Sequence, residues 1–391
     1  MLDFKSTQTF MLEYGNKTFD EFPFCDGDAF LLCEIFYMPF EDVVSSSFDD
    51  EPVDFKKAAT DLFNLRGAKH KGNGVAIFSH QPSRNMLRMA SMKRWQGMKI
   101  AAIEKKFTKS PAVSICIGTF IMPDGKVVVN YRGTDDTIAG WKEDFDIFIT
   151  NGTPSHPISR DYLDKAGETY DGDIIVIGHS KGGNMALYAA MNCKEEVRNR
   201  IISLYNNDGP GFYDHSFISG NAYQSLKPVY HHYIPKTDIV GTCMANDYDS
   251  KVVKTFVRFP LFQHYIGMWQ LKDGEAVTID GTSYICKIYD IWNSRICAKV
   301  EREGYSDVVE TVFDRVSVGF GYDTLTEFVQ HPVSAIKNGA EAWKEIDPEV
   351  REKFIDVFDG GFSHIKGTIK NLKNVDVQKL TESFFRGENL Q

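Results

Sequence analysis

The chain has 391 residues, of which 42% are hydrophobic and 25% charged, and its formal net charge is −10 at neutral pH. This length is too great for one small core, so we expect a large domain with an appended module. The acidic balance argues against a nucleic-acid partner, because phosphate binding needs a basic surface.

No stretch of the sequence approaches the ~18 consecutive apolar residues of a spanning helix, and the N-terminal residues lack the pattern of a signal peptide. We therefore expect a cytoplasmic protein without a transmembrane segment. Its seven cysteines are dispersed and form no C-x-x-C pair. This spacing predicts neither a disulfide framework nor a zinc site.

Residues 1 to about 110 have mixed patterns and are predicted to be partly helical. Helical apolar spacing covers 26–44, where acidic residues suit a helix N-terminus. A second helix is predicted over 83–107, where Met86, Met89, Met92 and Trp95 recur at helical steps. Such a stripe indicates a helix face that packs on the core, with a lipid-touching surface as the alternative.

Strand patterns begin at about residue 111 and alternate with helical ones. The segment 173–179 is apolar on both faces, which is typical of a central strand in a parallel sheet covered by helices. This alternation predicts an α/β fold with a doubly wound, mostly parallel sheet. The predicted strands are 112–122, 126–132, 173–179, 201–207 and 227–234, with helices between them over 156–170 and 180–199.

Beyond about residue 285 the strand patterns stop and amphipathic helices are predicted over 288–304, 306–320, 334–346 and 348–358. We expect an α/β domain over 1–285 and a helical C-terminal module over 286–391. Apolar helix faces of this length are rarely left in water, so the module should pack on the domain or on another subunit. A homo-oligomer formed through the C-terminal helices is therefore one expectation.

The segment IIVIGHSKGGNMALYAA contains G-x-S-x-G at Gly178, Ser180 and Gly182. This spacing is weak evidence alone, but here a strand pattern precedes it and a helix pattern follows it, the context of a nucleophile elbow. The sharp turn presents Ser180 Oγ above the sheet and aims the amide of Lys181 at a developing oxyanion. The motif predicts a serine nucleophile, which needs a histidine base and a carboxylate to orient it.

In α/β-hydrolases the partners follow in the order serine, acid, histidine. His264 follows the last predicted strand of the α/β region, so we predict that it is the base. Neighbouring His231 and His232 point to opposite faces of a strand and are interpreted as structural. The other downstream histidines are His215, followed in the helical tail by His331 and His364.

Two carboxylates are candidates for the acid. Asp208 directly follows the strand 201–207, and Asp238 follows the next predicted strand. Catalytic groups gather at the carboxyl ends of parallel strands, and both residues lie at that edge. The pattern leaves the two as alternatives.

The chain resembles a bacterial α/β-hydrolase family of unassigned function, distantly similar to class 3 lipases. The resemblance covers about 85–275 and implies an α/β-hydrolase-type fold, with Ser180 as nucleophile and His264 as base. It also implies that Thr134, after an Arg-Gly pair, supplies an oxyanion contact beside Lys181. The matching segments are YRGTDDTIAGWKEDF (131–145), GHSKGGN (178–184), NDGPGF (207–212), IPKTDIVG (234–241) and QHYIGMW (263–269).

The two related groups imply different acids. Class 3 lipases place the acid in an Asp-Ile-Val segment, which matches Asp238, whereas the closer family keeps the Asp-Gly-Pro-Gly-Phe segment of Asp208. The chain departs from that family at Tyr265, where an aspartate is usual.

These residues predict a serine hydrolase, esterase- or lipase-like, that cleaves a carboxylic ester of a small molecule or lipid through an acyl-enzyme on Ser180. This chemistry requires no metal and no organic cofactor. A catalytically silent hydrolase fold that acts as a binding or scaffold module is an alternative. An amidase, peptidase or thioesterase on the same triad is another, because the triad does not choose the leaving group.

Overall fold

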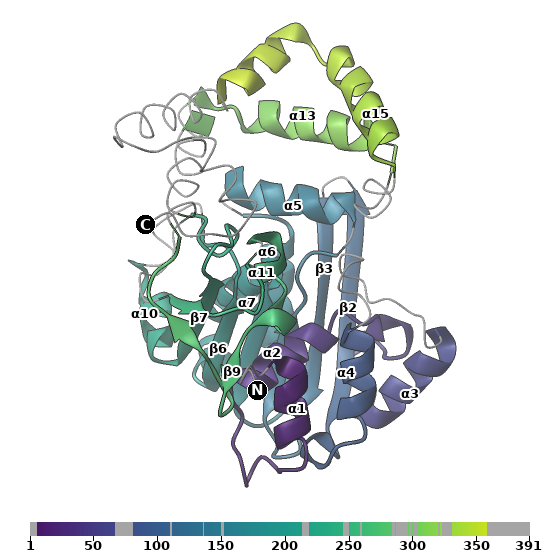
Figure 1. Ribbon diagram of the computed structural model, residues 1–391, viewed down its shortest axis with the longest axis vertical. Coiled ribbons are helices and arrows are strands. Elements are labelled where there is room, and N and C mark those ends of the chain that lie inside the picture. Colours follow the sequence, from purple (N-terminus) through teal and green to yellow (C-terminus); the bar gives the residue numbers. More distant parts are fainter. Residues whose placement is uncertain are drawn as a thin grey trace.

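A computed structural model of the chain is built around a nine-stranded sheet in the order β1-β2-β3-β4-β5-β6-β7-β8-β11 (Figure 1). The strands are β1 (Val53–Asp54), β2 (Lys99–Lys109), β3 (Ala112–Ile121), β4 (Val127–Tyr131), β5 (Ile174–His179), β6 (Ile201–Asn207), β7 (Tyr230–Pro235), β8 (Lys251–Val253) and β11 (Thr278–Ile279). A separate hairpin joins β9 (Leu271–Lys272) to β10 (Glu275–Ala276). The structure describes residues 6–66, 81–109, 112–135, 137–149, 152–212, 219–244, 250–258, 260–283, 286, 296, 299–300, 303–319, 321–322 and 331–357.

The sheet is mixed rather than mostly parallel. Its central strands β4 to β8 pair in parallel, whereas β1 to β4 pair antiparallel on one side and β11 pairs antiparallel with β8 on the other. A tight turn through Pro123-Asp124-Gly125 joins β3 to β4, and a connection this short can only make an antiparallel pair.

Helices cover both faces of the sheet, but different parts of the chain supply them. The N-terminal helices pack on the face that includes Ile175 and Ile177. The connecting helices pack on the opposite face, which includes Val176 and Leu204. The first group is α1 (Thr7–Tyr14), α2 (Asp26–Ile35), α3 (Phe55–Arg66) and α4 (Gln81–Met89); the second is α6 (Ser155–Thr169), α7 (Lys181–Asn192), α8 (Glu195–Arg198) and α10 (Asn221–Leu226).

This layering follows from the strand order. The strands from β4 to β7 lie side by side in chain order, and right-handed crossovers without a reversal place their helices on one face. The N-terminal helices supply the second layer. We expected a doubly wound sheet, in which the helices connecting the parallel strands cover both faces. The described connecting helices instead cover one face, and only the α/β character is as expected.

The five strands predicted between 112 and 234 are confirmed, but the helix predicted over 83–107 is wrong beyond Met89. Helix α4 ends at Met89, Gly97 adopts a positive φ of 84°, and β2 begins at Lys99. The segment becomes a strand because β2 pairs with β3 along nearly its whole length, and tertiary pairing overrides local pattern.

Described helices of the C-terminal region are α13 (Ser306–Gly319), α15 (Pro332–Glu345) and a helical stretch over 348–357, as predicted. They share a small core that includes Val309, Phe313 and Phe354. Helix α13 lies along α5 (Ile138–Ile149) (Figure 1), and Lys142 Nζ of α5 is 2.9 Å from Asp314 Oδ1. Most of the helix predicted over 288–304 lies outside the described residues, and the division at residue 285 stays a prediction.

No described helix combines the length and the apolar character needed to cross a membrane. The remaining short elements are α11 (Pro260–Gln263) and the 3₁₀ turns η1 (Phe40–Asp42), η2 (Lys93–Trp95), η3 (Lys227–Val229) and η4 (Ile266–Met268).

Candidate active site

Ser180 occupies the turn between β5 and α7, with φ 58° and ψ −133°, a conformation that normally favours glycine. A Cβ on Gly178 would come within 2.1 Å of the Gly182 carbonyl oxygen, and one on Gly182 within 2.0 Å of the Tyr131 carbonyl oxygen. Only glycine fits at either position. The turn leaves Ser180 9% exposed at the N-terminus of α7, and its hydroxyl has no hydrogen-bond partner among the described residues.

His264 lies in the turn between α11 and η4, and its Nδ1 is 2.8 Å from Asp208 Oδ2. Asp208 is fully buried directly after β6, and its other oxygen accepts the amide of Gly241 at 3.0 Å. The His264 Nδ1–H therefore donates to a carboxylate that is itself held in place. Its Nε2 has no hydrogen-bond partner within the described part of the chain.

Asp238 lies farther from the imidazole. Its Oδ1 is 3.6 Å from His264 Nδ1, beyond hydrogen-bond distance, and accepts the amide of Val240 in its own turn at 2.8 Å. These distances favour Asp208 as the residue that orients His264. The assignment of the acid stays a prediction until the two carboxylates are changed separately.

The two carboxylates change the proton affinity of the imidazole. Burial lowers the pKa of His264, but Asp238 and the hydrogen bond to Asp208 outweigh it and raise that pKa well above its ordinary value. Burial and the nearby Asp238 raise the pKa of Asp208 to about 8. The group of three side chains therefore retains a proton to a higher pH than an isolated histidine does.

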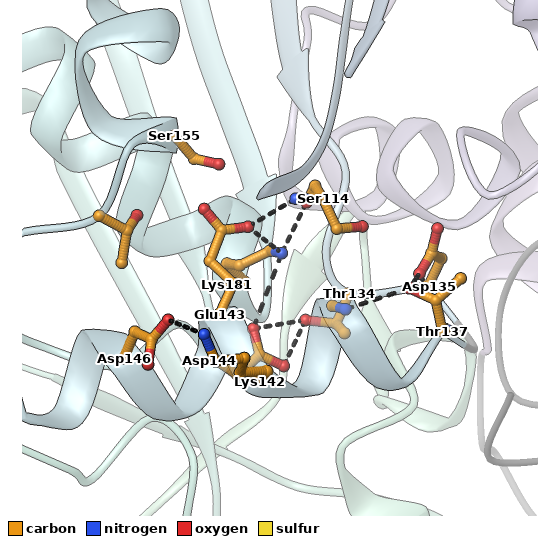
Figure 2. Close-up of polar contacts among 12 residues, drawn as sticks. Ser114, Thr134, Asp135, Thr137, Lys142, Glu143, Asp144, Asp146, Ser155 and Lys181 are labelled. Atoms are coloured by element: carbon orange, nitrogen blue, oxygen red, sulfur yellow. Dashed lines mark hydrogen bonds and ion pairs between the residues drawn. The ribbon is translucent and has the colours of Figure 1, made fainter. Parts of the chain in front are cut away.

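Thr134 and Lys181, the predicted oxyanion residues, are both tied to helix α5 (Figure 2). The Thr134 hydroxyl donates to Asp144 Oδ1 at 2.6 Å and to Oδ2 at 2.5 Å. The loop of Thr134 also lies close to the turn of Ser180, because a Cβ on Gly133 would come within 3.0 Å of Ser180 Cβ. The side chain of Lys181 is buried, with Nζ 3.0 Å from Glu143 Oε2.

Residues 89–314, more than half of the chain, match the family model described as Mbeg1-like. The chain belongs to the Mbeg1-like family. All the candidate residues from Thr134 to His264 fall inside the match. Among curated proteins none matches the chain. A solved structure titled "Crystal structure of M37 lipase" is similar at 14% identity and a TM-score of 0.36, over 73% of this chain and 93% of its own.

His179 is a further residue of the site in this Mbeg1-like chain, and sequence reasoning limited to histidines downstream of Ser180 misses it. Its Nε2 is 2.8 Å from the carbonyl oxygen of His264, and its Nδ1 is 2.9 Å from the Tyr37 hydroxyl. Burial lowers the pKa of His179 to about 3, so the ring is neutral. Its Nε2–H donates to the carbonyl while Nδ1 accepts the Tyr37 hydroxyl, which fixes the backbone of His264.

Tyr265, where the resemblance implied an aspartate, attaches the histidine loop to the N-terminal helices. Its hydroxyl donates to Glu34 Oε1 at 2.6 Å. Glu34 is fully buried and also accepts hydrogen bonds from Thr7 and Asn85, while burial raises its pKa. An aspartate in place of Tyr265 would face this carboxylate, whereas a tyrosine can donate to it.

The other histidines have separate surroundings or are not described. His231 stacks on Tyr205 with ring centroids 4.5 Å apart, and His232 Nδ1 is 2.7 Å from Ser250 Oγ. His331 precedes α15. Positions 215 and 364 lie outside the described residues.

Asp208, Asp238 and His264 present ligand atoms within 4.8 Å of one another, so this group could hold a metal ion. The Nδ1 atom of this group already donates a hydrogen bond to Asp208. The expectation that the chain uses no metal stays a prediction.

Proposed function

We propose that this chain is a serine hydrolase that cleaves a carboxylic ester through an acyl-enzyme on Ser180. The observation that carries the proposal is the hydrogen bond from His264 Nδ1 to buried Asp208, which leaves Nε2 available as a base. The strained conformation of Ser180 between two obligatory glycines supports it.

In the first step Ser180 Oγ attacks the ester carbonyl carbon while His264 Nε2 takes the hydroxyl proton. The amides of Thr134 and Lys181 hold the oxyanion, and each such donor contributes on the order of 3 kcal/mol. The imidazolium is stabilised by Asp208 and then protonates the departing alcohol.

Water attacks the acyl-enzyme in the second step, again with His264 as base, and releases the carboxylic acid and Ser180. These steps use side chains and amides of this chain alone. The proposed substrate is an ester of a small molecule or lipid.

The test combines labelling with turnover. A fluorophosphonate probe should label the wild-type chain, and Ser180→Ala should abolish both labelling and hydrolysis of p-nitrophenyl esters while the protein stays folded. Both assays should be run across a wide pH range and should gain rate at higher pH than an ordinary histidine base requires, because the pKa of His264 is raised and only the neutral ring can act as base. A panel of acyl chain lengths then defines the preferred ester.

The exposed Ser225 offers a matched control, and Ser225→Ala should label as the wild type does. Persistent labelling of Ser180→Ala would move the nucleophile to another residue. A folded wild-type chain that neither labels nor turns over any ester would favour a catalytically silent binding module.

A further inference from the structure

The residue after the proposed nucleophile has a charged side chain in an unusual place. The side chain of Lys181 is 1% exposed, and its Nζ donates to Glu143 Oε2 at 3.0 Å and to the Ser114 carbonyl oxygen at 2.6 Å. Burial of an ion pair at this depth is often no more stabilising than apolar side chains of similar size. Stability alone therefore does not explain why a lysine occupies the first turn of α7.

Helix α5 directs two consecutive carboxylates at the two proposed oxyanion residues (Figure 2). Glu143 pairs with Lys181, and Asp144 accepts the hydroxyl of Thr134. Lys181 Nζ is also 3.9 Å from Asp144 Oδ1, so the two contacts belong to one network.

Glu143 is itself fixed. It is fully buried, and its Oε2 accepts the backbone amide of Ser114 on β3 at 2.8 Å. The lysine is therefore held between a strand of the sheet and α5, rather than by one flexible partner.

We infer that Glu143 is a positioning residue for the proposed reaction: through the buried side chain of Lys181 it sets the place of the Lys181 amide relative to that of Thr134. Donors of an oxyanion hole act only when they lie about 2.7–3.1 Å from the oxyanion. This inference deepens the proposed function and rests on it.

The decisive variant is Glu143→Gln, because glutamine keeps an acceptor for the Ser114 amide but removes the charge that faces Lys181. We expect kcat for the best p-nitrophenyl ester to fall about 10²-fold, the loss typical of a displacement of about 1 Å, with KM nearly unchanged. The same measurement is made with the thiono analogue of that ester. Its C=S group accepts weaker hydrogen bonds, so the ratio of ester to thionoester rates should fall if the oxyanion contact is weakened.

Asp28→Asn is the matched control, because it also breaks a fully buried ion pair. Arg94 Nη2 is 2.6 Å from Asp28 Oδ2, and Arg94 otherwise contacts backbone carbonyls of the N-terminal segment. This variant should lower Tm and leave the rate ratio at the wild-type value. If Glu143 had only a structural role, Glu143→Gln would likewise lower Tm and leave the rate ratio at the wild-type value.

If Glu143→Gln does not fold, the double variant Glu143→Gln/Lys181→Met removes both buried charges and should fold with the lowered ratio. A folded Glu143→Gln variant with the kcat and the rate ratio of the wild type would overturn the inference and leave the hydrolase proposal intact. A wild-type chain with no labelling and no turnover would overturn both.

Discussion

Asp238→Asn tests how the second carboxylate acts on the proposed base. Asp238 Oδ1 lies 3.6 Å from His264 Nδ1 without a hydrogen bond, while it accepts the amide of Val240. Asparagine can keep the Val240 contact through its own Oδ1. The substitution therefore removes one negative charge beside His264 with little change in shape.

The size of the effect follows from this distance. Two unit charges 3.6 Å apart interact by about 5 kcal/mol at an effective dielectric constant of about 20, and by about 1 kcal/mol in water. The side chain of His264 is 22% exposed, so its surroundings lie between these limits. Since one pKa unit corresponds to about 1.4 kcal/mol, the pKa of His264 should fall by about one to three units.

The sign of the change in activity is determined by the direction of the shift. In the wild type the raised pKa of His264 means that its neutral, basic form appears only at a higher pH than for an ordinary histidine. Loss of Asp238 lowers the pKa of His264, so hydrolysis should extend to lower pH.

The measurement is kcat/KM against pH for one p-nitrophenyl ester, because its acid limb reports the base of the free enzyme. The midpoint of that limb should move down by about one to three units, and the alkaline plateau should stay within about tenfold of wild type. An unmoved or upward midpoint would refute this reading of Asp238. A collapse of the plateau would instead identify Asp238 as the acid of the triad.

Two further variants test the remaining assignments. Asp208→Asn should reduce kcat about 10⁴-fold on the plateau, because an amide at this position favours the wrong tautomer of His264; a loss under tenfold would exclude Asp208 as the acid. Lys142→Met removes the cation that pairs with Asp314 and Glu310 of α13. These acids are about half exposed, so the substitution should weaken the packing of α13 on α5 by about 1 kcal/mol at most. We expect faster proteolysis after residue 285, while labelling of Ser180 stays unchanged. Unchanged proteolysis would show that the ion pairs do not hold the C-terminal helices.

The sharp turn at Ser180 could be predicted from the sequence because its geometry is local. Two glycines around Ser180 are required by backbone atoms within the turn itself and by the neighbouring strand β4. The central strands could be predicted for a related reason, since a strand such as β5 is apolar on both faces. The choice between Asp208 and Asp238 could not be predicted from the sequence, because it depends on how far each of their two turns lies from the imidazole of His264.

Helix α5 and its role in the site were also not predicted. Its residues Lys142, Glu143, Asp144 and Asp146 are charged, and a pattern search assigns such residues to a solvated surface. In the structure each of them has an ion-pair or hydrogen-bond partner, and the spacing of hydrophobic residues in a sequence does not reveal such partners. The strand β2 was missed because its pairing with β3 is decided by the sheet and not by its own residues.

Ser180 and Asp208 both have positive φ, 58° and 55°, at the ends of the adjacent strands β5 and β6. Such a conformation costs a residue other than glycine about 1–3 kcal/mol, so each of these two turns carries backbone strain of that size. Under the proposed function, catalysis retains Ser180 and Asp208 at two positions where backbone strain alone would favour glycine. A relative released from the need for hydrolysis should drift toward glycine or asparagine there, which would mark the silent members of the family by two residues.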